Sequence, residues 1–356
     1  MNGDQPVTTI RHQLSLNENF AAPLPGVREA IVDGSGRVNL TLDAMSTGLT
    51  RAIAGHFGLD SAQVFVGPGS GALLQQFLTA FAGGGEVVHA WPSFEMYPLL
   101  VQNAGATAVP VALREDAHDL AAMADAVTER TKVVLLCNPN NPTGTVFGEA
   151  EMRTFLDRLP AGVLVLIDEA YADFADQSAI ANGIRLAAED PRVCVVRTFS
   201  KSHGLLGLRV GYLIADEAVV TGLRPGSYFF RVSTVAQDAA IVALRAEEVM
   251  RRQCAEVAAE RDRVYARLLA LGLEVPRSHG NFHWLTLGEA NESFVRFCAA
   301  GGIEVRTLAG GAGVRVTVGT PEANDALLEL TRRFLHGDEP PGGDSQARQP
   351  VSVDRA

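Results

Sequence analysis

Short, nearly uninterrupted apolar runs recur through residues 60–215 and alternate with segments whose apolar residues repeat at helical spacing. The runs are GEVVHA, ATAVPVAL, KVVLLCN, VLVLIDEA, RVCVVRTF and RVGYLIAD, and the helical segments between them include SGALLQQFLTAFA, FEMYPLLVQNAG and GEAEMRTFLDRL. Strands that are apolar at nearly every position are typical of a sheet that helices cover on both faces. The pattern therefore predicts a doubly wound α/β fold with a mainly parallel sheet.

The rest of the chain predicts a smaller second unit. A charged segment rich in Ala, Arg and Glu, from Ala236 to Leu271, is expected to form one long connecting helix. The runs NFHWLTL, GIEVRTL and GVRVTVG, followed by the helical segment NDALLELTRRFL, predict a small α+β domain. We expect an N-terminal arm with a short helix (1–35), a large cofactor-binding domain (36–245), a small domain (246–336) and a polar, Pro- and Gly-rich disordered tail (337–356).

Composition excludes several classes of partner. The formal net charge is -11 and no basic block occurs, which argues against nucleic acid. No apolar run approaches the length of a membrane span, and the N-terminus lacks the pattern of a secretion signal. The cysteines are widely separated and show neither metal-ligand nor disulfide spacing, so we expect no metal and a reducing, cytoplasmic location; they are Cys137, Cys194, Cys254 and Cys298.

Only two lysines occur in the chain, Lys132 and Lys201. Arginine does not act as a neutral amine near neutral pH, so side-chain amine chemistry is confined to these two residues. Lys201 follows an apolar run, at the strand end where doubly wound folds bind ligands. Thr198, Ser200 and Arg209 nearby offer the hydroxyls and the planar cation that a phosphate prefers. An isolated lysine here would more often be a solvated surface charge, but the three neighbouring residues favour a phosphate-containing ligand site.

Asp168 closes another apolar strand, within the segment IDEAY. A carboxylate buried there is costly unless it is paired with a donor or a cation. A protonated pyridine nitrogen would be a suitable partner, because the carboxylate would keep the ring poor in electrons. The alternative is an aspartate that caps the next helix.

Two turns carry weaker signals. In GPGSGA, the residues Gly69, Ser70 and Gly71 precede a helical segment, and free backbone N–H groups at a helix start can bind phosphate. The spacing is not that of the Walker motif. In CNPNNPTG, prolines stiffen the turn from which Asn141 projects. Either segment alone could be an ordinary turn.

Two further side chains are candidates for ligand contact. Arg315 lies in the alternating strand GVRVTVG, where its planar guanidinium could bind a carboxylate or could lie on a solvated sheet face. Phe94, in the segment WPSF, could stack on a planar ring or could be part of the core.

Taken together and in this order, the segments NPNNPTG, IDEAY and RTFSKSHGLLGLRVGY resemble the fold-type I pyridoxal-phosphate aminotransferases, most closely the histidinol-phosphate aminotransferase branch. The resemblance runs from about Leu16 to Leu335 and implies a homodimer. It implies that Lys201 holds pyridoxal 5'-phosphate as a Schiff base and moves the proton during the reaction. The other implied contacts are Asp168 to the pyridine nitrogen; Asn141 and Tyr171 to the ring hydroxyl; Phe94 to the ring face; Gly69, Ser70, Gly71, Thr198, Ser200 and Arg209 to the phosphate; and Arg315, Arg306 and Asn141 to the substrate.

The implied activity is transfer of an amino group between an α-amino acid and a 2-oxo acid. The substrate-side segments depart from the family pattern: one usual tyrosine is lost at Ala21 or displaced to Phe20, Thr41 stands where another is usual, and His203 stands where an aromatic residue is usual. These departures suggest a non-standard amino acid of specialised metabolism. The alternatives are histidinol-phosphate transamination, or decarboxylation or oxidation on the same scaffold. A non-catalytic ligand sensor would need an additional DNA-binding domain, for which the sequence has no pattern.

Overall fold

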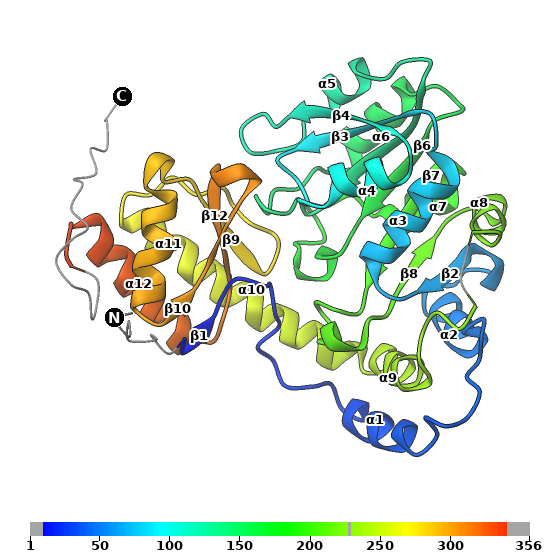
Figure 1. Cartoon of the computed structure of the whole chain (residues 1–356), viewed down its shortest axis with the longest axis horizontal. Helices are drawn as coiled ribbons and strands as arrows, with labels where there is room; N and C mark the ends of the chain where they lie inside the picture. Colours follow the sequence, from blue (N-terminus) through cyan, green and yellow to red (C-terminus); the bar gives the residue numbers. More distant parts are fainter. Residues whose placement is uncertain (1–9, 227–228, 340–356) are drawn as a thin grey trace, which may run out of the picture.

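The computed structural model describes residues 10–226 and 229–339. Figure 1 shows a large sheet with helices on both faces and a smaller sheet with its own helices, and the long helix α10 (Glu247–Ala270) runs between the two. Residues 1–9 of the predicted arm and residues 340–356 of the predicted tail lie outside the described part of the chain. Within that part, no helix is both long and apolar enough to cross a membrane.

The large sheet has seven strands in the order β2-β8-β7-β6-β5-β3-β4. All six predicted runs form strands, and only β8 runs antiparallel to its neighbours. The sheet also contains β2, whose short run was not among the predicted strands. The strands are β2 (Val64–Gly67), β3 (Glu86–Trp91), β4 (Thr107–Ala112), β5 (Thr131–Cys137), β6 (Leu164–Asp168), β7 (Val193–Thr198) and β8 (Gly211–Ile214).

Alternate residues of the central strands enter two separate hydrophobic cores. In β6, for example, Val165 and Ile167 pack into one core and Leu166 into the other. The helices of the first core include α2 (Thr47–Phe57), α5 (Leu120–Asp125), α6 (Glu149–Arg158), α7 (Gly183–Glu189) and α9 (Thr234–Arg245), together with Val27 at the start of α1 (Val27–Ser35) and the first half of α10. Those of the second are α3 (Ser70–Phe81), α4 (Tyr97–Asn103) and α8 (Glu217–Leu223). Burial on both faces explains the continuous apolar runs and confirms the α/β prediction.

The prediction of one long helix over 236–271 is wrong, because the structure has two helices in this segment. The helix α9 ends at Arg245 and α10 begins at Glu247, with Ala246 between them at φ -90° and ψ 25°. No Gly or Pro marks the break. The two helices have different neighbours: α9 packs against α1 and α2, whereas α10 reaches α12 (Pro321–Leu335) and the small sheet. Tertiary packing therefore sets the break, against local helix propensity.

The small sheet has the order β11-β12-β9 and is antiparallel. Its strands are β9 (Phe282–Leu285), β11 (Arg306–Leu308) and β12 (Gly313–Thr317), and α11 (Asn291–Ala300) and α12 pack in the same core. The predicted run GIEVRTL is divided between β11 and β10 (Ile303–Glu304). β10 pairs in parallel with β1 (His12–Gln13), so the N-terminal arm joins the small sheet's side of the molecule.

The strand ends bring the predicted motifs together. Cys137, at the end of β5, is the register partner of Asp168, and Thr198, at the end of β7, is that of Gly211. Gly211 in turn pairs with Gly67, which leads into α3. Because neighbouring strands present these ends at one edge of the sheet, segments that lie far apart in the sequence meet there.

Candidate active site

Lys201 lies directly beyond β7 and is enclosed by the N-terminal arm. Its Nζ donates to the carbonyl oxygens of Leu16 (3.2 Å) and Asn17 (3.0 Å). Asn19 holds the lysine backbone by donating to the carbonyl of Lys201 at 3.0 Å. Burial, together with the positive charges of Arg315 and Arg209, lowers the pKa of Lys201 to about 7. A substantial fraction of this amine is therefore neutral near pH 7, as a nucleophile requires.

Asp168 is buried at the carboxyl end of β6. The hydroxyl of Tyr97 donates to its Oδ2 at 3.1 Å, and Ala170 N donates to Oδ1 at 3.2 Å. Burial raises the pKa of Asp168 to about 6, against the opposing effect of the hydrogen bond from Tyr97. Phe94 makes an edge-to-face contact with Tyr97, with the ring centroids 5.5 Å apart. Phe94 and Asp168 therefore share one aromatic neighbour, which the sequence reading did not identify.

The predicted phosphate-binding residues converge at the start of α3. Gly69, at φ 91°, lies so close to the Arg209 guanidinium that a Cβ added there would come within 2.7 Å of Nη2. Arg209 Nη1 lies 3.5 Å from Ser200 Oγ, and Thr198 Oγ1 donates to the same oxygen at 2.8 Å. A Cβ added to Gly211 would lie 3.0 Å from the backbone nitrogen of Ser70, the first residue of α3. Glycine at both positions permits this close approach.

Asn141 and Arg315 contact each other across the two parts of the molecule. Nη1 of Arg315 donates to Oδ1 of Asn141 at 2.9 Å, and Nη2 donates to the carbonyl of Ser15 at 2.8 Å. Arg315 is buried, and its Nε has no hydrogen-bond partner among the described residues. The solvated-face alternative for Arg315 is therefore wrong. A buried guanidinium with an unpaired donor is suited to receive an anionic group.

Asn17 connects the arm to Tyr171 and is a residue that the sequence reading missed. Its Nδ2 donates to the Tyr171 hydroxyl at 2.9 Å, and its backbone carbonyl is one of the two acceptors of Lys201 Nζ. Burial raises the pKa of Tyr171 to about 12. Lys201 Nζ lies 5.8 Å from the centroid of the Tyr171 ring. Nothing local to residues 15–19 points to this contact, since its partner lies 154 positions away.

Arg306 lies opposite Arg315 in the pairing of β11 with β12. Its Nη2 donates to Glu95 Oε1 at 2.7 Å, and its side chain is 45% exposed. The structure thus brings Arg306 near the other candidate residues, but with a carboxylate partner that the sequence pattern did not indicate.

A partly buried ion-pair network links the neighbours of Asp168 and Lys201. Glu169, next to Asp168, accepts from Arg197 Nε at 2.8 Å and Nη2 at 2.7 Å. Arg197 also lies 3.6 Å from Asp173, whose Oδ2 accepts from Ser202, the residue after Lys201, at 2.5 Å. These contacts join the ends of β6 and β7 behind the candidate site.

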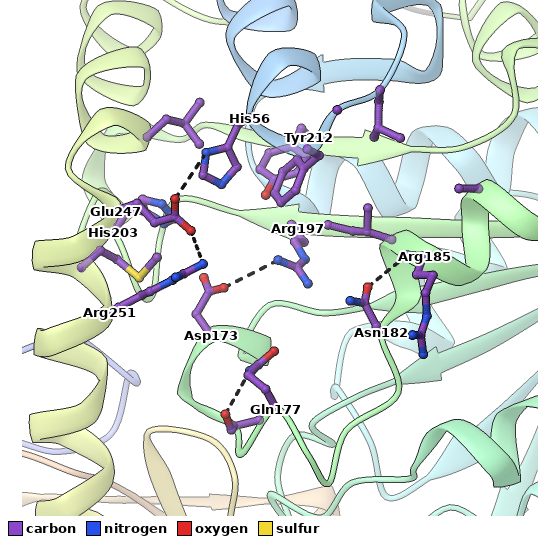
Figure 2. A pocket seen from close by; sticks show the side chains of 18 residues that line it. His56, Asp173, Gln177, Asn182, Arg185, Arg197, His203, Tyr212, Glu247 and Arg251 are labelled. Carbon is purple, nitrogen blue, oxygen red and sulfur yellow. Dashed lines mark hydrogen bonds and ion pairs between the residues drawn. The ribbon is translucent and has the colours of Figure 1, made fainter.

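Part of this network lines a cavity of about 830 Å³ between α2, α7 and the start of α10. Figure 2 shows Asp173 and Arg197 pointing toward each other, with His56 paired to Glu247 at the rim. His203, one of the altered positions expected on the substrate side, lines this cavity, whereas none of the residues predicted to hold cofactor or substrate does. The arginines of the cavity already have carboxylate partners: Arg197 with Glu169, Arg251 with Glu247 and Arg185 with Glu149. The candidate active site is therefore the strand-end site around Lys201 and not this cavity.

Comparison with known proteins gives concordant results. The family described as aminotransferase class I and II matches residues 11–330. Curated relatives named aromatic amino acid aminotransferase include one from Streptomyces avermitilis, 47% identical and covering 91% of each chain, and one from Thermobifida fusca, 47% identical and covering 90% of each. The solved structure of a Sinorhizobium meliloti histidinol-phosphate aminotransferase in complex with pyridoxal-5'-phosphate matches with a TM-score of 0.84 at 27% identity, over 91% of this chain and 92% of that one.

Proposed function

We propose that aromatic amino acids are the amino donors of this chain, which belongs to the class I and II aminotransferase family and transfers an amino group between an α-amino acid and a 2-oxo acid. The observation that supports aminotransferase chemistry is the Lys201 amine, which has a pKa of about 7 and lies at the same sheet edge as the buried Asp168. The relatives at 47% identity bear the aromatic name, and this supports an aromatic donor over the specialised amino acid suggested by the sequence.

We further propose pyridoxal 5'-phosphate as the cofactor, and the residues present fit it. Asp168 is a buried carboxylate suited to a protonated ring nitrogen. Arg209 offers a cation and Ser200 a hydroxyl to a phosphate group. The backbone of Gly69 lies so close to Arg209 that a Cβ on this residue would not fit. Lys201 would hold the cofactor covalently, and Asn141 and Tyr171 would contact its ring hydroxyl. Ser70, Gly71 and Thr198 would complete the phosphate site, and Phe94 would lie against the ring.

The proposed chemistry divides between the cofactor and the chain. When bound, the cofactor supplies an electron sink that makes the proton on the substrate α-carbon acidic. Lys201 Nζ, released when the substrate amine takes its place and partly neutral at pH 7, would accept that proton and deliver it to the cofactor C4′ and not back to the α-carbon. Asp168 would place its negative charge toward a protonated ring nitrogen, and Tyr97 orients this carboxylate by donating a hydrogen bond to Oδ2.

Arg315 is the proposed partner of the substrate carboxylate. Its guanidinium is already oriented by Asn141 and Ser15, and its free Nε is a donor that a carboxylate can use. Retaining the carboxylate in an ion pair favours transamination over decarboxylation, because loss of carbon dioxide would leave this buried cation unpaired. The Tyr171 and Phe282 rings, 4.9 Å apart edge to face, form an apolar wall beside it.

The donor preference can be measured directly. We expect kcat/KM for phenylalanine, tyrosine or tryptophan to exceed that for histidinol phosphate by at least about tenfold, because burial of an aromatic ring contributes roughly 1.5–3 kcal/mol. The measurement is a steady-state comparison of amino donors with one common 2-oxo acid. Alanine serves as the control for the reaction without a large side chain. A clear preference for histidinol phosphate would contradict the aromatic assignment.

We propose that two copies of the chain form a homodimer through an exposed apolar patch. The patch combines Val38 and Leu40, 74% and 61% exposed, with Phe229 and Phe230, 73% and 56% exposed. The two segments are adjacent, since Phe230 N donates to the carbonyl of Ala44. Large exposed apolar patches mark interaction surfaces. The departure at Thr41 lies within the same loop.

Changing the patch should therefore change the assembly. The double variant Leu40→Asp/Phe229→Asp is expected to sediment as a monomer, because two charges would have to be buried in the interface, whereas the unaltered chain sediments as a dimer. The matched control Val32→Asp alters an exposed apolar residue, 61% exposed, outside the patch and should remain dimeric. Monomeric sedimentation of the unaltered chain at micromolar concentration would contradict the proposal.

The division into domains is also proposed. The break between α9 and α10 supports the limits 36–245 and 246–336, although Met250, Cys254 and Val257 of α10 still pack in the core of the large domain and only Val264 and Leu268 pack in that of the small one. A cytoplasmic location stays a prediction, and the four cysteines are free, buried thiols.

A further inference from the structure

The ion pair between Glu95 and Arg306 lies beside the proposed carboxylate site and has no part in the chemistry described above. Glu95 follows Phe94 in the loop between β3 and α4, and Arg306 begins β11 of the small sheet. The two residues are 211 positions apart in the chain, yet Nη2 and Oε1 are separated by 2.7 Å. The pair thus joins the two sheets at the mouth of the site.

Strand pairing shows why this ion pair faces the substrate. Arg306 and Arg315 are direct register partners in the antiparallel pair β11 and β12. Side chains at directly opposite positions lie on the same face of a sheet. Arg315 is 7% exposed, whereas the side chain of Arg306 is 45% exposed, so Arg315 is the inner guanidinium and Arg306 the outer one. A substrate whose carboxylate binds Arg315 would have Arg306 beside it.

Two like charges at directly opposite positions repel each other. Glu95 offsets this repulsion, and its negative charge acts on Arg315 in the direction opposite to that of Arg306. Without Glu95, the outer end of the site would carry an uncompensated cation and would attract a second anionic group. With Glu95 in place, the outer end is neutral as a pair.

We propose that Glu95 sets the charge preference for the substrate side chain by neutralising Arg306. The inference rests on the proposed function and deepens it: the masked arginine suits a neutral aromatic side chain and disfavours one that ends in a carboxylate or a phosphate. An anionic side chain would meet the attraction of Arg306 and the repulsion of Glu95 together. An aromatic ring needs neither charge, so the pair costs it little.

The test measures binding of two unreactive probes to the holoenzyme by titration calorimetry: glutarate, which has two carboxylates, and 3-phenylpropionate, which has one carboxylate and an aromatic ring. Glu95→Gln is expected to raise the affinity for glutarate about fivefold and to leave that for 3-phenylpropionate within about twofold. Fivefold corresponds to about 1 kcal/mol, the upper end for a partly exposed ion pair.

Two controls isolate the masking effect. Glu292→Gln removes the same charge from a residue that accepts a hydrogen bond from Thr307, next to Arg306, and should change neither affinity. The double variant Glu95→Gln/Arg306→Gln should lose the gain for glutarate, because the unmasked cation is gone. The proposal is overturned if Glu95→Gln leaves glutarate binding unchanged, or if both probes weaken equally, as they would if the pair only held the two sheets together.

Failure of this proposal is distinguishable from failure of the proposed function. If the unaltered enzyme binds 3-phenylpropionate and transaminates phenylalanine while Glu95→Gln behaves like the unaltered chain, only the masking role of Glu95 is lost. If the unaltered enzyme neither binds 3-phenylpropionate nor uses aromatic donors, the aromatic assignment itself is wrong, and the masking proposal is overturned with it.

Discussion

Replacing Lys201 with alanine is expected to lower kcat/KM by more than about 10⁴-fold, because we propose that this one side chain supplies both the covalent attachment and the proton transfer. The visible absorbance of the covalently attached cofactor should disappear in the same variant. The chain provides a matched control, since Lys132 is its other lysine and lies exposed on β5. Lys132→Ala should keep both the absorbance and the activity. Turnover by the Lys201 variant at the unaltered rate would end the proposed mechanism.

The low pKa of Lys201 can be checked without any turnover. At pH 7 about half of this amine is neutral, because its pKa is about 7. Trace acetylation of the cofactor-free protein, followed by mass spectrometry, reports the reactivity of each lysine against pH. The midpoint for Lys201 is expected near pH 7, and the presence of only two lysines makes the assignment of each label unambiguous. A midpoint near the ordinary lysine value would contradict the pocket described here.

Asp168→Asn is expected to reduce kcat/KM by about 10²–10³-fold, the usual cost of removing one aligned electrostatic partner of a reacting group. The amide is nearly the same size as the carboxylate but cannot hold a proton on the ring nitrogen. The control is Asp157→Asn, the same chemical change at an exposed residue of α6, which should stay within about twofold of the unaltered activity. Steady-state kinetics at saturating cofactor measures the difference, and equal activity of the two variants would contradict the role of Asp168.

The same substitution should have the opposite effect on the stability of the cofactor-free protein. The pKa of Asp168 is about 6 in the folded chain, against an ordinary value of 3.8 for an aspartate, so the folded state binds more protons between these pH values. Stability therefore falls as pH rises from about 4 to 6, by about 3 kcal/mol in order of magnitude, and remains lower above pH 6. Asn carries no such penalty, so the melting temperature of the variant should exceed that of the unaltered chain above pH 6. Equal melting temperatures at pH 7 would contradict this account.

The meeting of many candidate residues could be predicted because they lie at strand ends. Lys201, Asp168, Asn141 and Thr198 each follow an apolar run that had to be a strand, and the carboxyl ends of parallel strands meet at one edge. The rarity of lysine narrowed the choice of nucleophile to two residues. Local pattern was sufficient here because burial on both faces of a sheet leaves a continuous apolar signal in the sequence.

Other parts of the site depend on contacts that no local pattern carries. Tyr97 lies at the start of a helix and looks like an ordinary core aromatic, yet its hydroxyl contacts Asp168, 71 positions away. Asn17 contacts Tyr171 because β1 pairs with β10 and brings the arm across the site. Arg306 was expected to meet substrate directly, and its pairing with Glu95 became visible only once the two sheets were placed together.

By itself, the sequence determined the α/β alternation, the strand ends and the residue types at them, because hydrophobic periodicity records which faces are buried within each segment. Tertiary structure alone decided where α9 gives way to α10, how the N-terminal arm encloses Lys201, and which carboxylate faces Arg306. The physical reason is that these features arise from packing and ion pairs between segments distant in the chain, whose energies leave no periodic trace in either segment.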